Sequence, residues 1–438
     1  MRRRAPARAV GRLSMRARIE APLPKSAFLR SVGLLTSGTV LAQGILALSL
    51  PVLTRLYSPE DFNLLAVYTS VLGLVTVISC LRFNIAISLP EDDRVAMNLL
   101  VLALGAATGF ALLIALPTLL APRASAALLG QPAIESYLWM IPVGVLLASA
   151  YDALQYWASR KRRFGLVSQT RVTRALGGAG VQVGLGSFSA TPFGLILGQV
   201  VYSGVGLIGL LRSLLRHDRA AASGISRATL KRAAIDYRKF PMFSVPEALF
   251  NTGGLELSIL IIAASAAGPE AGFLMLAMRV MGLPMGLVGN SIGQVYLAEA
   301  PQRLRDGDLA AFTRRMMWTL FKAGAPVLAL AAVACPLLFP LIFGAEWARA
   351  GVIVAWLTPM FILQFVASPV SMVLHVIGKL ASAMWLQIGG GVLRVGAVVV
   401  ASQMAPNLIT ETFAVSGAAF YLGMIALVYV YIREVARP

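Results

Sequence analysis

The sequence predicts an all-α integral membrane protein with about twelve transmembrane helices, in two six-helix halves around a central cavity. Composition is the first observation, because 58% of the 438 residues are hydrophobic, 13% are charged, and the mean hydropathy is +0.77. The second is a series of apolar runs long enough to cross a hydrocarbon layer about 30 Å thick, which takes about 20 helical residues. The third is a weak internal repeat, in which the residues after Phe62 resemble those after Phe273 if one position is skipped.

Twelve apolar runs are expected to form the membrane spans. They cover approximately residues 32–54, 64–88, 95–120, 137–158, 166–188, 192–214, 240–264, 271–297, 318–343, 350–374, 381–402 and 411–432. This order divides the chain into a basic tail, an N-terminal six-helix half, a basic linker, a C-terminal six-helix half and a short second tail. The expected boundaries are 1–27, 28–214, 215–239, 240–433 and 434–438.

The basic residues are distributed unequally between the two sides of the predicted spans. Of the 38 Lys and Arg residues, 33 are counted with the loops and adjoining span ends on the side that carries both chain ends, three lie on the opposite side, and Arg279 and Arg394 remain inside spans. Positively charged loops remain in the cytoplasm, so both termini and the 215–239 linker are expected there, in a multi-pass protein of the inner membrane. Topology therefore accounts for the net charge of +19, and anionic lipid headgroups rather than nucleic acid are the expected partner.

The basic segments at the chain start and in the linker carry two smaller predictions. Residues 1–27 contain one acid, Glu20, a composition shared by transit peptides and cytoplasmic tails. The tail is favoured because the following apolar run is longer than the hydrophobic region of a signal peptide and lacks a small-x-small cleavage site. Met15 is an alternative start. In the linker, the pattern from Arg227 to Lys239 favours a short helix on the inner leaflet.

Ionisable side chains inside two consecutive spans single out the stretch from Lys239 to Ala298. Glu247, Glu256 and Arg279 lie well within these spans, where a charge costs roughly 2.5–3.5 kcal/mol or more unless it meets water or a partner. Helix-interrupting residues also occur there, and the backbone groups that they free are satisfied only in a protein-lined or watery cavity. These residues are Pro241, Pro246, Gly253, Gly254, Pro284 and Gly286. The pattern favours interrupted helices along a substrate path.

Further polar residues complete the candidate site. Asn251, Asn290 and Gln294 are candidates for the cavity lining, and Arg394 lies near the midplane of the eleventh span. Arg279 and Arg394 suit bidentate contacts with an anionic substrate group, and the alternative for both is an internal ion pair. The acids available for such pairs are Asp152, Glu247 and Glu256.

Several other motifs receive a structural interpretation. Gly204, Gly206 and Gly209 satisfy the spacing of a dinucleotide-binding loop but lie inside an apolar span, where small residues let helices pack closely. Four tryptophans at predicted span ends, namely Trp139, Trp157, Trp318 and Trp347, are expected to be interface anchors. Two Cys and two His residues supply neither a disulfide framework nor a soft-metal ligand set, so no metal is expected. No cofactor is expected either.

A set of short motifs resembles the polysaccharide biosynthesis proteins. The turn LTRLYSPEDF at 53–62 is followed by LRFNIAISLPEDD at 81–93, and the second half contributes GPEAG at 268–272, LAMRVMGLP at 276–284, IGQVY at 292–296 and LIFGAEW at 341–347. As a set these are similar to the repeat-unit flippases of O-antigen and exopolysaccharide pathways, within the multidrug/oligosaccharidyl-lipid/polysaccharide (MOP) exporter superfamily. Glu256 departs from the pattern, because a neutral residue is expected at its position.

The resemblance implies a flippase rather than an enzyme. Its substrate would be a polyprenyl-diphosphate-linked oligosaccharide, transported to the outer leaflet by alternating access, and a polysaccharide polymerase or export complex would be a partner. Arg279 and Arg394 would then contact the diphosphate. Glu256, Glu247 and Asp152 are candidates for ion coupling, with Glu256 preferred because Glu247 is closer to cytoplasmic water.

Two other functions are considered. A drug or cation antiporter of the same superfamily would favour an acidic cavity, whereas arginines accompany the acids here. A membrane glycosyltransferase or polymerase would need catalytic groups in sizeable outer loops, and the longest outer loop has about seventeen residues.

Overall fold

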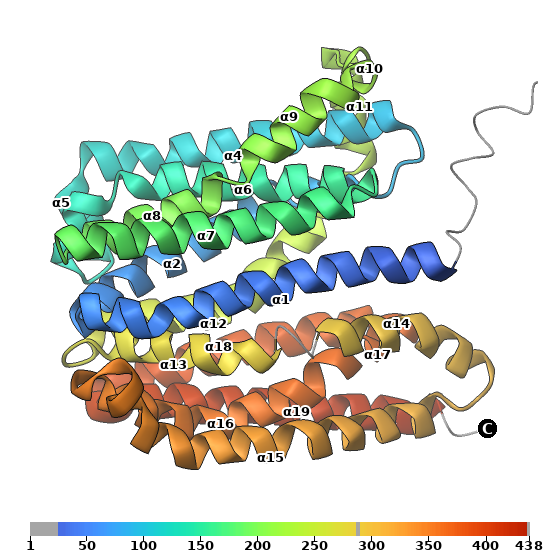
Figure 1. The fold of residues 1–438 in the computed structure, drawn as a ribbon. Helices are drawn as coiled ribbons and strands as arrows, with labels where there is room; N and C mark the ends of the chain where they lie inside the picture. Colours follow the sequence, from blue (N-terminus) through green and yellow to red (C-terminus); the bar gives the residue numbers. More distant parts are fainter. Residues whose placement is uncertain (1–24, 286–289, 436–438) are drawn as a thin grey trace, which may run out of the picture.

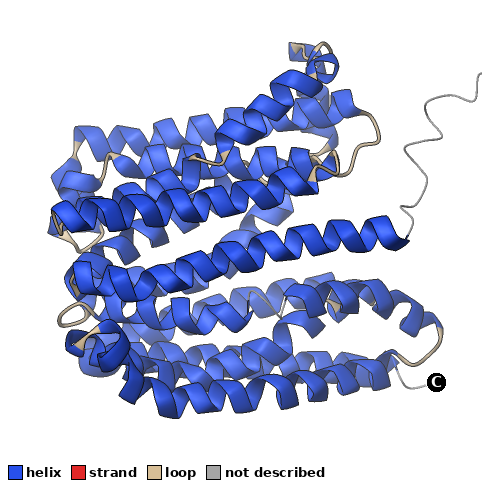
Figure 2. Ribbon diagram, in the orientation of Figure 1, coloured by secondary structure: helices blue, strands red, loops and turns tan. Residues whose placement is uncertain are grey.

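The computed structural model describes residues 25–285 and 290–435, although a few side chains within these ranges, among them those of Asn290, Gln294 and His375, lie outside the described part. All regular structure in these two ranges is helical, with no strand (Figure 2). The prediction of an all-α protein is confirmed.

The helices follow one another through short connections. Up to the linker the chain forms α1 (Lys25–Leu56), α2 (Pro59–Ser79), α3 (Phe83–Ala86), α4 (Asp93–Leu120), α5 (Pro122–Leu128), α6 (Met140–Arg160), α7 (Phe164–Phe188), α8 (Pro192–Gly204), α9 (Leu207–His217), α10 (Arg219–Ala222) and α11 (Arg227–Asp236). The rest forms α12 (Val245–Ser265), α13 (Glu270–Pro284), α14 (Asn290–Arg305), α15 (Leu309–Phe343), α16 (Ala348–Val370), α17 (Val373–Val376), α18 (Leu380–Met404) and α19 (Ile409–Val435).

The long helices run side by side along the length of the molecule (Figure 1). On one side, α4 packs against α6, α6 against α8 and α8 against α7, and on the other side α15 packs against α16, α16 against α19 and α19 against α18. Between these groups, α1 packs along α7 and also contacts α13 and α15. α2 packs against both α6 and α12, and α12 in turn packs against α18. The central helices therefore join the two groups.

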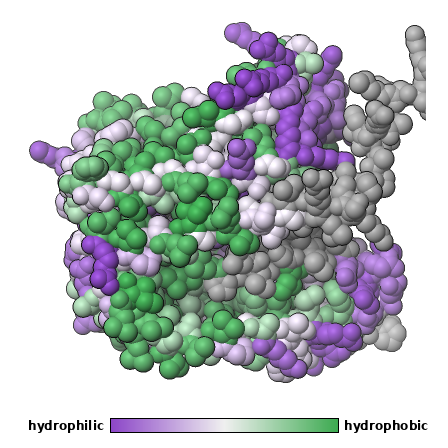
Figure 3. All heavy atoms as spheres, in the orientation of Figure 1, coloured by the Kyte–Doolittle hydropathy of each residue, from purple (hydrophilic) through white to green (hydrophobic). Residues whose placement is uncertain are grey.

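Nine helices within the described ranges are long and apolar enough to cross a membrane. The expected spans 137–158 and 166–188 form α6 and α7, which carry ionisable residues such as Asp152 and Arg174, and the expected span 271–297 is divided between α13 and α14. Apolar residues cover the middle of the face seen in Figure 3, with hydrophilic residues toward its ends. These features support a multi-pass membrane protein, and the count of twelve spans stays a prediction.

α12 is not interrupted where the sequence pattern indicated. It runs unbroken through Gly253 and Gly254, and the irregular segment precedes it as a π-helix over Phe240–Ser244. That segment contains Pro241, which lacks the backbone donor of a regular helix. A Cβ at Gly254 would lie 2.9 Å from the Cα of Gly391, so the glycine is needed for the close approach of α18. The expected break at the glycine pair is therefore wrong.

The glycines at 204 and 206 do serve packing. The helix breaks between α8 and α9, and a Cβ at Gly206 would lie 2.6 Å from the ring of Tyr151 on α6. The predicted linker helix also forms, as α11, which packs against α4. Thr229 of α11 donates a hydrogen bond to Asn98 of α4 at 3.0 Å.

Trp347 is buried at one end of the bundle rather than placed at an interface. Its side chain is 0% exposed, and its indole Nε1 donates to the carbonyl of Thr54 at 3.1 Å. The rings of Phe62 and Phe273 meet it edge-on, at centroid distances of 4.8 and 5.9 Å. Because a buried indole N–H needs an acceptor, this cluster ties the start of α16 to α1, α2 and α13. The interface prediction for Trp347 is wrong.

Two further contacts hold the same end together. Arg55 donates from Nη2 to the carbonyl of Leu341 at 3.0 Å, which joins α1 to α15. Gly272 of α13 lies against the backbone of Pro59 and Asn63, and a Cβ there would be 2.8 Å from the Asn63 nitrogen. The end at which α1 leads into α2 is therefore closely packed across the central helices.

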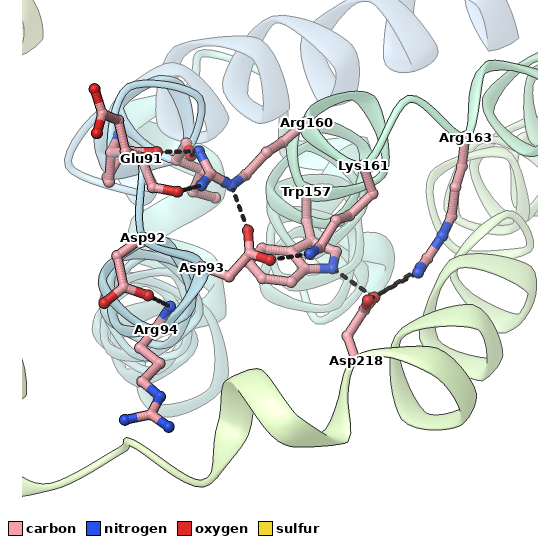
Figure 4. A network of polar contacts seen from close by, with 11 residues as sticks. Glu91, Asp92, Asp93, Arg94, Trp157, Arg160, Lys161, Arg163 and Asp218 are labelled. Carbon is pink, nitrogen blue, oxygen red and sulfur yellow. Dashed lines mark hydrogen bonds and ion pairs between the residues drawn. The ribbon is translucent and has the colours of Figure 1, made fainter. Parts of the chain in front are cut away.

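A polar network joins the loops at the end of the bundle opposite Trp347 (Figures 1 and 4). The Nε of Arg160 donates to Asp93 at 3.1 Å, and its terminal nitrogens donate to the carbonyls of Ile87, Pro90 and Glu91. The side chain of Arg160 thus holds the turn formed by the LPEDD residues of the second sequence motif. Charge-assisted bonds of this kind are stronger than neutral ones.

Trp157 takes part in the same network. Its Nε1 donates to Asp218 at 2.9 Å, and Arg163 donates to both oxygens of that carboxylate, at 2.7 and 2.8 Å (Figure 4). The interface prediction for Trp157 is therefore also wrong, whereas Trp139 and Trp318 are exposed as expected.

We expect Gly272→Ala to lower the thermal unfolding midpoint of the purified protein, because the added methyl would overlap the α2 backbone and overpacking costs about 1–3 kcal/mol. Gly423→Ala in α19 is the matched control, since nothing lies within 4 Å of its Cβ position and alanine is the better helix former. Equal midpoints for the two variants would show that the crossing of α13 and α2 is not close.

Candidate functional site

A cavity of about 330 Å³ lies between α1, α7, α8 and α13. The polar side chains of its lining are Gln43, Ser49, Gln182, Gln199, Tyr202 and Arg279. The first two come from α1, the next from α7, two more from α8, and the arginine from α13. The cavity therefore lies where a helix of the C-terminal part meets three helices of the N-terminal part.

Arg279 has no partner among the described residues in this cavity. Its side chain is half-buried, and no hydrogen bond or ion pair joins it to another described residue. Tyr202 is its electrostatic neighbour. The predicted alternative, an internal ion pair with an intramembrane acid, is absent among the described residues. The guanidinium of Arg279 can therefore bind an anionic substrate group without first breaking an ion pair.

Two amide side chains of the lining also have no hydrogen-bond partner among the described residues. The side chains of Gln43 and Gln199 make no hydrogen bond with the described residues. The amide of Gln182 differs, because its Nε2 donates to the carbonyl of Leu195 at 3.0 Å. The cavity thus presents a cation and two neutral hydrogen-bonding groups, and each free amide can both donate and accept.

Small residues and one tyrosine set the shape of the α7–α8 wall. A Cβ at Gly178 would lie 2.8 Å from the Cβ of Tyr202 and 3.2 Å from the carbonyl of Gly198. Tyr57, in the turn after α1, donates to the carbonyl of Gln182 at 2.7 Å. Burial, with a contribution from the charge of Asp61, raises the pKa of Tyr57 to about 12, so its hydroxyl remains a donor.

Arg174 packs against Tyr202, one of the residues that line the cavity. Its Nε donates to the carbonyl of Tyr202 at 2.7 Å, and its guanidinium lies over the rings of Tyr151 and Tyr202, at 3.8 and 4.4 Å from the centroids. Such stacking stabilises a desolvated cation by about 2 kcal/mol. Tyr202 is therefore held in place between Arg174 and the cavity.

Arg394 lies away from this cavity. It is 5% exposed, its Nε donates to the carbonyl of Gly390 at 3.3 Å, and its guanidinium lies 4.5 Å from the ring centroid of Phe420. Gly254 of α12 packs against it, with a Cβ position 3.1 Å from its Nη2. The structure therefore does not bring Arg279 and Arg394 into one lining.

The acidic candidates are also separated. Because α12 is continuous, Glu247 and Glu256 point in different directions, and Glu247 is exposed together with Asn251. Glu256 is half-buried against α2, with Ser70 as its hydrogen-bonding neighbour and the Cβ position of Gly73 3.0 Å from its Oε1. A break at Gly253 and Gly254 would have allowed both acids to face one cavity, and the continuous helix prevents this.

Asp152 has no ion-pair partner among the described residues, and two of the polar candidates lie outside them. Asp152 of α6 has Arg82 and Arg174 as electrostatic neighbours, and neither is within ion-pair distance. The side chains of Asn290 and Gln294 lie outside the described part of the structure. No cluster of three or more metal-ligating side chains occurs in the described residues.

Sequence reasoning missed the neutral part of the lining. Gln43, Gln182 and Gln199 lie in apolar runs, and this signal was available in the sequence because polar side chains inside a span mark interior positions. Tyr202 gave no such signal, because a tyrosine in a span is equally suited to packing.

The fold is similar to that of solved membrane transporters. The lipid II flippase MurJ, in an inward closed conformation, aligns with a TM-score of 0.70 at 11% identity over 92% of this chain and 90% of that chain. An inward-facing multidrug resistance MATE family transporter of the MOP superfamily gives 0.67 at 14% identity over 91% and 95%. A MOP superfamily transporter from Pyrococcus furiosus gives 0.56 at 14% identity over 93% and 96%. Identities this low establish the fold alone.

No curated protein matches the chain in sequence. A family model described as polysaccharide biosynthesis protein matches residues 52–351, which is more than half of the chain. The matched range contains the motifs at 53–62, 81–93 and 268–284, together with Arg279 and the cavity-lining residues of α7 and α8. The chain therefore belongs to the polysaccharide biosynthesis protein family.

Proposed function

We propose that this protein is a flippase for polyprenyl-diphosphate-linked oligosaccharide units in the biosynthesis of lipopolysaccharide O-antigen or of an exopolysaccharide or capsule. It moves the units across the cytoplasmic membrane and changes no covalent bond. Arg279 carries the proposal, because it is a cation with no partner among the described residues, in a cavity whose other polar lining side chains are neutral.

The chemistry of the lining suits the junction between a diphosphate and a sugar. The planar guanidinium of Arg279 can donate two parallel hydrogen bonds to phosphate oxygens. Gln43 and Gln199 can exchange hydrogen bonds with sugar hydroxyls, and Tyr202 offers a ring beside them. The oligosaccharide itself is larger than the cavity, so the cavity would hold the junction while the remainder lies outside it.

The proposed architecture has twelve spans in two six-helix halves, residues 28–214 and 240–433, with both termini in the cytoplasm. α6, α7 and the α13–α14 pair would complete the nine apolar helices. The packed end around Trp347 would face outward, and the polar network around Asp93 and Asp218 would face the cytoplasm. Closure at the outer end fits a state that receives substrate from the inner leaflet.

The ionisable residues outside the cavity have other proposed roles, namely ion coupling for the acids and a later substrate contact for Arg394. Glu256, on the α12 face toward α2, is the proposed coupling group, and Glu247 and Asp152 are the other candidates. Arg394 would reach substrate only after a movement of α18 relative to α12 and α19, because it is now buried against Phe420. A drug or cation antiporter is less well supported, because the described lining contains an arginine and no carboxylate.

Reporter fusions test the proposed topology. A reporter within residues 215–239 or after Pro438 should give a cytoplasmic signal, and reporters at 123–133 and 404–409 should give an outer signal. The reason is the distribution of Lys and Arg, 33 on one side and three on the other. An outer signal from the 215–239 fusion would exclude the twelve-span architecture.

Arg279→Ala tests the substrate site. Each charge-assisted hydrogen bond contributes about 1.5–3 kcal/mol, so we expect roughly tenfold or greater loss of surface polysaccharide and accumulation of lipid-linked units, at normal protein level. Arg279→Lys should recover part of the export, because a point charge replaces a planar fork. Arg123→Ala is the matched control, since its side chain is 92% exposed and paired only at the surface with Glu135. Normal export by Arg279→Ala would contradict the proposal.

Glu256→Gln tests ion coupling. The amide keeps the shape and the hydrogen bond with Ser70 but cannot titrate, so we expect transport into proteoliposomes to lose its dependence on a proton gradient. Glu247→Gln, on the same helix but exposed, should retain that dependence. Equal gradient dependence in wild type and Glu256→Gln would remove this residue from the coupling mechanism.

A further inference from the structure

We propose that α9 carries a binding site for an anionic phospholipid of the cytoplasmic leaflet. Its surface combines an apolar groove with two arginines that have no acidic partner among the described residues. The groove, of about 390 Å³, is lined by Ile208, Leu211, Arg212, Leu215 and Arg216. The assignment of this surface to the cytoplasmic leaflet rests on the proposed topology, whereas the site itself is independent of the transported substrate.

The two faces of α9 have different roles. Leu210 is buried in the core with Leu207 and Leu214 packed beside it, so this face fixes the helix to α6 and α7. On the opposite face Ile208, Leu211 and Leu215 are 64%, 46% and 54% exposed. These positions are three or four residues apart, so the exposed side chains form one continuous stripe.

Neither arginine of the stripe is paired with Asp218, the acid that follows them in the sequence. Arg212 and Arg216 are one turn apart, and no ion pair or hydrogen bond joins either side chain to another described residue. Asp218 follows two residues later but is buried and bound by Arg163 and Trp157 (Figure 4). A complementary negative charge for the pair must therefore come from outside the described chain.

The direction of α9 places this pair at the end of a membrane-spanning segment. The chain bends at Val205 and Gly206, and α9 leaves the line of α8 toward the linker helices (Figure 1). Ile208 and Leu211 precede both arginines in the segment 192–217, and Arg216 follows the last apolar residue, Leu215, so the groove begins in the apolar layer and ends at headgroup level. A lipid with an acyl chain and an anionic phosphate matches both parts, whereas a soluble anion would use only the arginines.

Lipid retention by the purified full-length protein tests the site. Native mass spectrometry would compare bound cardiolipin, phosphatidylglycerol and phosphatidylethanolamine in wild type and in the double variant Arg212→Gln/Arg216→Gln. Each arginine near an anionic surface contributes about fivefold, so the double variant should bind the two anionic lipids about thirtyfold more weakly, with unchanged phosphatidylethanolamine binding. Arg227→Gln/Lys231→Gln is the matched control, because it removes the same charge from exposed positions of α11.

A third variant separates the apolar part from the charged part. Leu211→Asn keeps both arginines but makes the groove polar, so it should weaken retention of all three lipids to a similar degree. Anionic lipid binding that is equal in wild type and the arginine double variant, or lowered equally by the α11 control, would overturn the site. So would displacement of cardiolipin by equimolar polyprenyl diphosphate, because the groove would then bind the transported lipid. Loss of export by Arg279→Ala is independent of each result.

Discussion

An apolar solvent cannot hydrogen-bond, and this constraint governs the arrangement of the polar groups in the bundle. The buried indole of Trp347 donates to the carbonyl of Thr54, and Arg160 donates hydrogen bonds to three backbone carbonyls before α4. Arg394, which has no carboxylate partner, stacks on Phe420 and donates to the backbone of its own helix. The guanidinium of Arg279, in contrast, has no partner among the described residues and lines the cavity.

Close backbone approach is the second organising feature. Without interhelical water to expel, helix association relies on packing, so glycine is placed where two backbones meet. Gly254 meets Gly391 at the crossing of α12 and α18, and Gly272 meets the start of α2. The same residue type was interpreted from sequence as a helix break at Gly253 and Gly254. Propensity alone cannot distinguish these roles, because a glycine inside a continuous helix and one at a break differ only in what lies opposite.

The candidate site was predicted in part. Arg279 could be identified because a cation deep in an apolar run must face a cavity or a partner, whatever the fold. The same argument applied to Arg394, Glu247 and Glu256, but the structure distributes these over other helix faces. The sequence shows which residues of one span share a helix face. Which helix that face packs against depends on the tertiary structure. The free amides of Gln43 and Gln199 acquire meaning only when α1 and α8 converge on α13.

The sequence by itself determined the class of the protein and, through its motifs, the family, because each depends on local composition or on short segments read in order. The twelve spans and the sidedness of the positive charge stay predictions from the same patterns. Tertiary structure alone decided that Trp157 and Trp347 are buried and that Asp218 is bound by Arg163, which leaves Arg212 and Arg216 on α9 without a partner in the described part of the chain. The physical reason is that a side chain becomes buried, paired or free according to its neighbours, and helices distant in sequence supply most of those neighbours in a bundle.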